Sequence, residues 1–144
     1  MNQRLTLSLL PDTLAVCQLA AAAPIPSWVT NGNFVSLTRT RDELSIVCAQ
    51  RDVPNDIRCE RDWRALKVEG PLDFALTGIL ASLAAPLADA GISIFAVSTF
   101  DTDYVLVKAN MLAHAINVLK HSGHQFENLK SEIKNELAQA TKPR

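Results

Sequence analysis

The stretch that decides the fold reads TGILASLAAPLADAGISIFAVSTFDTDYVLVK and covers residues 77–108. Its first half places apolar residues at the i, i+4, i+8 spacing of one helix face: Ile79, Leu83 and Leu87. This spacing predicts an amphipathic helix over residues 77–90. Pro86 interrupts its hydrogen bonding and kinks its axis, and Gly91 stands where a helix usually ends.

The second half of the stretch predicts a β-hairpin. Residues 92–98 and 104–108 are apolar or alternating, and the polar turn 99–103 separates them. Residues 34–40 and 43–49 show the same pattern, so we expect a second hairpin earlier in the chain.

The two hairpins are weakly similar to each other. Residues 38–49 align with residues 98–109 without a gap, at an offset of 60. Residues 5–7 match residues 66–68 at an offset of 61. Each half then reads strand, crossover, hairpin, helix, which is the order of a ferredoxin-like fold. We therefore predict an α+β protein of two tandem ferredoxin-like (βαββαβ) units, each an antiparallel sheet with helices on one face.

The N-terminal segment is read in four parts. Residues 5–10 alternate like a strand, and Pro11-Asp12 predicts a turn. Residues 14–19 fit either a second strand or a short helix. Residues 20–33 form a connection that we expect to contain a helical turn at 27–29.

The C-terminal third predicts two helices. Asn110 is a favourable N-cap for the first, and Gly123 is its stop. The second is an amphipathic helix marked by Phe126, Leu129, Ile133 and Leu137. The expected domains are a degenerate first unit over 1–62, a regular second unit over 63–125, and a helical tail over 126–144.

Composition limits the functional classes. The 144 residues carry a net charge of -1, with 48% hydrophobic and 20% charged residues. This balance lacks the electrostatic footprint of nucleic-acid or membrane-surface binding, so we expect neither partner. No secretory leader is visible, and three cysteines without metal-ligand spacing suit a reducing compartment. We expect a cytoplasmic protein.

Few side chains are candidates for chemistry. His114 and His121 lie seven residues apart on one helix, too far along its axis to share a metal with His124. Asp101 and Asp103 form a pair that can hold Mg²⁺ or act as acid and base, although aspartate is also common in turns. Because a nucleophile, a base and an orienting group do not occur together, we predict no enzyme, no metal and no cofactor.

Four segments carry a family resemblance, and they lie within residues 5–124. They read VEGPLDFALTGI (68–79), PLADAGISIF (86–95), STFDTDYVLV (98–107) and TRDELSIVC (40–48), and the Pro26-Ser27-Trp28 element fits with them. Together they resemble the ACT domain, and more narrowly the stand-alone tandem ACT proteins of bacteria and the related cytosolic arginine sensors of animals. One departure is the spacing of Asp73 and Gly78, which is five residues where many ACT domains have three.

The resemblance implies a homodimer or higher assembly whose ACT units pack edge to edge, with an amino acid at the seam. Carried over by position, the ligand-binding residues are Gly70, Asp73, Phe74, Thr77, Gly78, Ile79, Ser98, Thr99, Phe100 and Asp103. Asp73 or Asp103 would bind the ammonium group or a basic side chain, and residues 77–79 at the helix start would bind the carboxylate. Phe100 would cover an aliphatic portion.

The functional hypothesis is a non-catalytic regulatory module that binds an amino acid at an ACT–ACT interface and regulates a separate protein. Two alternatives stay open. One is an interaction or oligomerisation module without a small ligand, built on the sheet edges and the tail helix. The other is an enzyme of unknown type.

Overall fold

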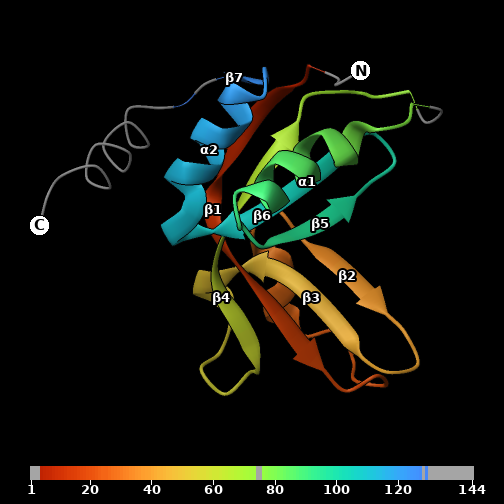
Figure 1. The fold of residues 1–144 in the computed structure, drawn as a ribbon. Helices are drawn as coiled ribbons and strands as arrows, with labels where there is room; N and C mark the ends of the chain where they lie inside the picture. Colours follow the sequence, from red (N-terminus) through yellow and green to blue (C-terminus); the bar gives the residue numbers. More distant parts are fainter. Residues whose placement is uncertain (1–3, 74–75, 128, 130–144) are drawn as a thin grey trace, which may run out of the picture. The chain divides into compact units, whose positions relative to one another are not determined.

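A computed structural model describes residues 4–73, 76–127 and 129 (Figure 1). The elements follow in the order β1 (Thr6–Leu19), a 3-10 helix (Ser27–Asn31), β2 (Ser36–Arg39), β3 (Leu44–Ala49), a 3-10 helix (Gln50–Asp52), β4 (Cys59–Val68), α1 (Ile79–Asp89), β5 (Ile94–Ser98), β6 (Asp103–Lys108), a 3-10 helix (Ala109–Met111), α2 (Leu112–His121) and β7 (Gln125–Glu127). Contacts divide the chain into two compact units. The N-terminal unit is Pro11–Arg64, and the C-terminal unit combines the residues up to Leu10 with those from Ala65 onward.

The N-terminal unit is a small antiparallel sheet without an α-helix in its described residues 11–64. β2 pairs with β3, which confirms the first predicted hairpin, and β3 pairs with the second half of β1. The expected helical turn is the 3-10 helix Ser27–Asn31, held over the sheet by buried Val29. The core of this unit is made by Ala15, Cys17, Val29, Leu44, Ile46, Cys48 and Val53.

The turn predicted at Pro11-Asp12 is wrong, because β1 runs without interruption from Thr6 to Leu19. Pro11 is exposed, and a proline is compatible with a strand wherever no neighbouring carbonyl needs its missing amide. The ambiguous segment 14–19 is therefore a strand. Because β1 is continuous, its first residues lie in the C-terminal unit and its later residues in the N-terminal unit.

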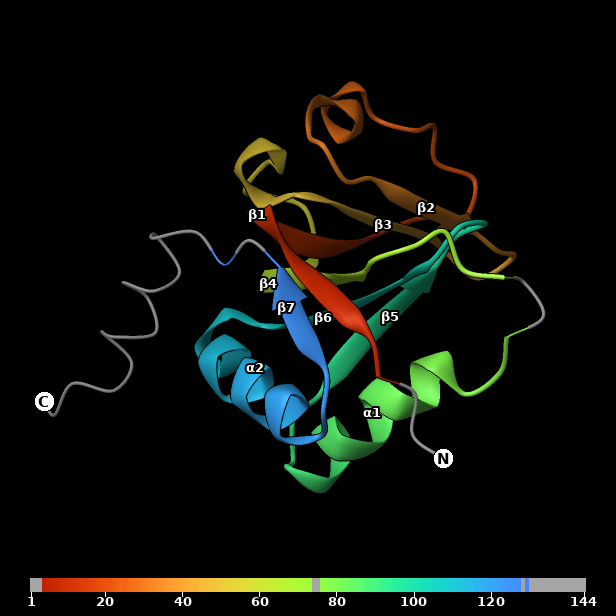
Figure 2. The same ribbon diagram turned by 90° about the horizontal axis from the view of Figure 1, so that it is seen from above.

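The C-terminal unit has the predicted α+β architecture. β5 and β6 form the second hairpin, and α1 and α2 lie side by side on one face of the sheet (Figure 2). One strand pair departs from the all-antiparallel expectation, since β7 runs parallel to the start of β1. The core between sheet and helices includes Leu7, Leu66, Val68, Leu83, Leu87, Val105, Val107, Ile116 and Leu119.

Pro86 lies inside α1 because another group takes over its missing hydrogen bond. A proline at this position leaves the Ser82 carbonyl, four residues earlier, without its helical donor. The Nε2 atom of His124 lies 3.0 Å from that carbonyl oxygen, and the Leu5 backbone N–H donates to His124 Nδ1 at 3.1 Å. Since Nδ1 accepts, the proton stands on Nε2. His124 is 3% exposed and links β1, α1 and the start of β7.

The predictions for the C-terminal third need two corrections. Asn110 is not an N-cap, because it lies inside the 3-10 helix Ala109–Met111 that leads directly into α2. Phe126 is not helical but belongs to β7, where strand pairing with β1 overrides the helical apolar spacing. Gly123 does follow the end of α2, with a left-handed φ of 97°. The remaining tail-helix positions from 130 on lie outside the described residues.

The internal repeat is real but its offset is 59 at the hairpins, not 60. Arg39 pairs with Leu44 and Ser98 pairs with Asp103, each as the last pair before a four-residue turn. In both turns the backbone N–H of the first residue donates to the carbonyl of the last, at 2.9 Å and 2.8 Å. The predicted alignment is therefore one residue out of register in the strands.

Candidate functional site

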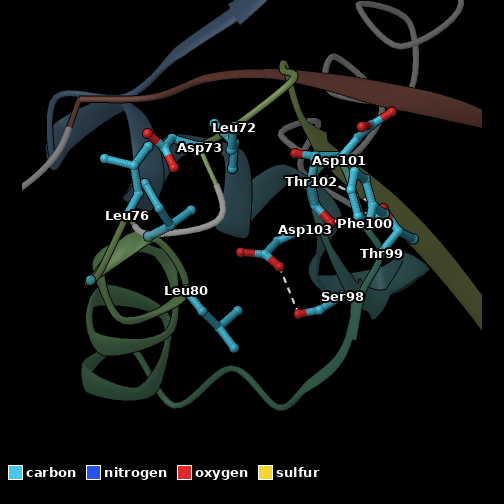
Figure 3. Close-up of a pocket in the computed structure, with 12 residues that line it drawn as sticks. Leu72, Asp73, Leu76, Leu80, Ser98, Thr99, Phe100, Asp101, Thr102 and Asp103 are labelled. Carbon is cyan, nitrogen blue, oxygen red and sulfur yellow. Dashed lines mark hydrogen bonds between the residues drawn. The ribbon is translucent and has the colours of Figure 1, made fainter.

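The Asp103 pocket, of about 290 Å³, lies in the C-terminal unit. Three segments surround it: the loop that enters α1, the first turn of α1, and the turn between β5 and β6 (Figure 3). Its lining residues are Leu72, Asp73, Leu76, Gly78, Ile79, Leu80, Ser98, Thr99, Phe100, Asp101, Thr102 and Asp103. Its volume matches the small end of the range for ligand pockets.

Two hydrogen bonds hold the β5–β6 turn, one to the loop that enters α1 and one to the end of β4. The Leu72 backbone N–H donates to the Asp101 carbonyl at 2.8 Å, and Thr102 Oγ1 donates to the Val68 carbonyl at 2.6 Å. Thr102 is buried. At Gly70 a Cβ atom would stand 3.0 Å from the Leu72 nitrogen and 3.2 Å from the Asp101 oxygen. Glycine therefore lets the loop approach the turn closely.

The β5–β6 turn is also fixed from within. Thr99 Oγ1 donates to the Thr102 carbonyl at 3.0 Å and accepts from the Thr102 backbone N–H at 3.3 Å. The turn presents Phe100 outward, with 83% of its surface exposed. A pre-shaped turn costs a ligand little ordering entropy.

The pocket is acidic on its side-chain side. Asp73, Asp101 and Asp103 are among the lining residues, and the described lining contains no lysine or arginine. The Asp101 side chain extends away from the pocket, whereas the Asp103 carboxylate lies within it (Figure 3). Figure 3 shows the Asp103 carboxylate between the leucines of the loop and helix and the β5–β6 turn. Ser98 Oγ donates to Asp103 Oδ1 at 2.6 Å, which orients this carboxylate.

The backbone side of the pocket is positive. α1 begins at Ile79 after Gly78, whose φ of 80° is left-handed, and no side chain caps this helix end. The first backbone N–H groups of a helix have no partner within the helix and carry its positive dipole end. Such a terminus favours a carboxylate or other anion. The pocket thus places an anionic side chain near the partly positive start of a helix.

Most of the predicted site residues come together here. Seven of the ten line the pocket: Asp73, Gly78, Ile79, Ser98, Thr99, Phe100 and Asp103. Gly70 and Thr77 are not lining residues, and Gly70 instead shapes the loop from behind. Phe74 lies outside the described residues. Their roles as ligand contacts stay predictions.

Sequence reasoning missed five lining residues: Leu72, Leu76, Leu80, Asp101 and Thr102. Leu80 follows Ile79, the first residue of the predicted apolar face of α1. Its place beside that face could have indicated a side chain at the edge of the core, where the pocket lies. Asp101 stood out as half of an acidic pair but was not assigned to the ligand site. The orientation of the Thr102 side chain depends on its hydrogen bond to Val68 of β4, which no local sequence pattern predicts.

The remaining candidates do not form a second centre. The described ranges contain no group of three or more histidine, cysteine or acidic side chains placed to hold a metal ion. His121 Nδ1 lies 2.9 Å from the Asn117 carbonyl on its own helix, and His124 has the structural role given above. Within the described part of the chain, no helix has the length and apolarity needed to cross a membrane.

These features define a tandem ferredoxin-like protein with a small pocket of mixed apolar and acidic lining in its C-terminal unit. An ACT domain model matches residues 58–121, and a model of an N-terminal domain matches residues 12–56. Residues 58–121 therefore contain an ACT domain, and the chain has the fold of the aspartokinase subunits that contain such domains.

Three relatives illustrate the range of the family. The human cytosolic arginine sensor for mTORC1 subunit 1 is 33% identical over 111 residues, which are 72% of this chain and 33% of that protein. The chain thus spans about a third of the length of this curated relative. An Agrobacterium tumefaciens protein of known structure is 42% identical, with a TM-score of 0.83 over 87% of this chain and 93% of that one. The regulatory subunit of Thermus thermophilus aspartate kinase shares the fold at 9% identity, with a TM-score of 0.55 over 81% and 96% of the two chains.

Proposed function

We propose that this chain is a non-catalytic regulatory module that binds a free amino acid in the Asp103 pocket. The observation that carries the proposal is the pairing of the Asp103 carboxylate with the uncapped start of α1 in one pocket. The ligand ammonium group binds Asp103, and Asp73 of the loop lines the same pocket. The ligand carboxylate accepts hydrogen bonds from the first backbone N–H groups of α1. Both contacts are charge-assisted and therefore among the stronger hydrogen bonds.

The acidic lining favours a ligand with a second positive charge. The described lining includes Asp103 and no basic residue, and a nearby carboxylate favours a ligand group that carries a positive charge. A curated relative carries the name arginine sensor, which supports placing basic amino acids first among the candidates. The same relative is named as cytosolic and as acting for another protein complex, which supports a cytosolic regulator of a partner protein.

A second ACT unit would complete the site. Phe100 and Leu76 stand at the pocket with 83% and 46% of their surfaces exposed. Large exposed apolar side chains beside a polar pocket are typical of an interface. We propose that a homodimer buries them and closes the pocket over the ligand, so that binding and assembly are coupled.

The test is a thermal-shift screen against the twenty common amino acids, followed by calorimetry and light scattering. At 100 times its Kd a ligand stabilises the fold by about 2.7 kcal/mol, which such a screen detects readily. A shift selective for one amino acid supports the proposal. A flat panel overturns it and favours the interaction module without a small ligand.

A further inference from the structure

Arg39 of the N-terminal unit occupies the position that Ser98 holds in the C-terminal unit. Each is the last strand residue before its four-residue turn, Arg39 on β2 and Ser98 on β5. The equivalence follows from strand register and does not depend on how the two units are arranged. What differs is the size and charge of the side chain.

The Arg39 guanidinium reaches the loop that follows β1. Its Nη1 donates to the Ala21 carbonyl, and its Nη2 donates to the Ala23 carbonyl at 2.9 Å. These alanines lie between β1 and the 3-10 helix Ser27–Asn31. By its place in the repeat, this segment corresponds to the loop between β4 and α1 that borders the Asp103 pocket.

The residue opposite Arg39 differs between the repeats as well. Arg39 pairs with Leu44, whereas Ser98 pairs with Asp103. The N-terminal unit thus has an exposed arginine that binds two loop carbonyls, with the buried Leu44 as its partner on the neighbouring strand. The C-terminal unit has a short hydroxyl and a carboxylate in those places, with a pocket between loop and turn.

We propose that Arg39 is the built-in occupant of the ligand site of the N-terminal unit. Its guanidinium binds the loop carbonyls at the place in the repeat where the C-terminal unit has an open pocket. A tethered group competes at an effective concentration of millimolar or above, so Arg39 excludes free ligands from this site. The chain then binds one external amino acid, in the C-terminal unit. The last statement rests on the proposed function, whereas the occupancy by Arg39 does not.

The occupancy is tested by removing the side chain and supplying its head group. Arg39→Ala is titrated with methylguanidinium chloride, and backbone amide shifts are followed by NMR. Wild type and Arg41→Ala serve as matched controls, since Arg41 is an exposed arginine in the adjacent turn. Sodium chloride at equal ionic strength controls for screening. If Arg39→Ala does not fold, Arg39→Gln replaces it, with the same outcomes.

Saturable shifts at residues 21–23 and 38–40 in Arg39→Ala, with at least a fivefold smaller response there in both controls, would support the proposal. Equal responses in the three proteins, or none in Arg39→Ala, would overturn it. Shifts at residues 98–103 report on the Asp103 pocket separately in the same spectra. The proposed function is tested separately by the amino-acid screen, and a flat screen would count against it and leave the assignment of Arg39 standing.

Discussion

Replacing Asp103 with asparagine removes one charge from the pocket and little else. Asparagine is nearly isosteric with aspartate, and its Oδ1 can still accept the Ser98 hydroxyl that Asp103 Oδ1 accepts at 2.6 Å. The β5–β6 turn should therefore keep its shape. What is lost is the charge that binds the ligand ammonium.

The size of the effect follows from the burial of Asp103. A hydrogen bond to a charged group contributes about 1.5–3 kcal/mol, and the lower end applies because Asp103 is only half-buried. A loss of about 1.5 kcal/mol raises the Kd about tenfold. The free energy of unfolding without ligand should change by no more than about 0.5 kcal/mol, as for an ordinary surface substitution.

Calorimetry with the amino acid selected by the screen measures this change directly. Asp89→Asn is the control, because Asp89 is an exposed aspartate of α1 that does not line the Asp103 pocket. Its Kd should stay within about twofold of wild type. An Asp103→Asn protein that is folded and binds as tightly as Asp89→Asn would refute the assignment of the ammonium to Asp103.

Three further substitutions or measurements test other parts of the structure. Gly70→Ala should weaken ligand binding and lower the melting temperature, because its Cβ would stand 3.0 Å from the Leu72 nitrogen; unchanged binding by calorimetry would contradict the role of the close approach. His124→Phe should lower the free energy of unfolding by about 1–3 kcal/mol for each partner left unsatisfied. Adding Pro86→Ala should recover part of this loss, because residue 86 then donates its backbone N–H to the Ser82 carbonyl that His124 bonds in the wild type. Additive effects of the two substitutions in urea unfolding would contradict this compensation. Burial, and after it the neighbouring Cys17, raises the pKa of the Cys59 thiol, so iodoacetamide should label Cys59 more slowly than free cysteine at pH 8. Because the unfolded thiol ionises first, the contribution of Cys59 to stability should be lost as the pH rises above the unfolded pKa of about 8.5. Equal labelling rates would contradict the raised pKa.

Local periodicity was sufficient to predict both hairpins and α1. In these elements the apolar spacing coincides with burial, as for Ile79, Leu83 and Leu87, all of which are buried. The strand through Pro11 was missed because turn propensity is local, whereas the continuity of β1 depends on partners far along the chain. Phe126 was missed for the same reason, since its parallel pairing with β1 joins residues more than a hundred positions apart.

The sequence predicts those parts of the candidate site that follow from the order of the elements along the chain. The loop before α1 and the turn after β5 are both readable, and the pocket lies between them. The contribution of Thr102 and the supporting role of Gly70 were not readable, because both depend on contacts between segments about thirty residues apart.

The register of the repeat determines which residues occupy equivalent positions in the two units. At an offset of 60 Asp103 aligns with Glu43, so both repeats seem to carry an acid at the same point and to be equivalent sites. At the observed offset of 59 Asp103 aligns with Leu44, and Ser98 aligns with Arg39. Side chains alternate between the faces of a strand, so a slip of one residue exchanges core and solvent positions. The observed register therefore places an arginine in the first repeat where the second has a serine, and a leucine where the second has Asp103, so the charges at the two turns differ in sign.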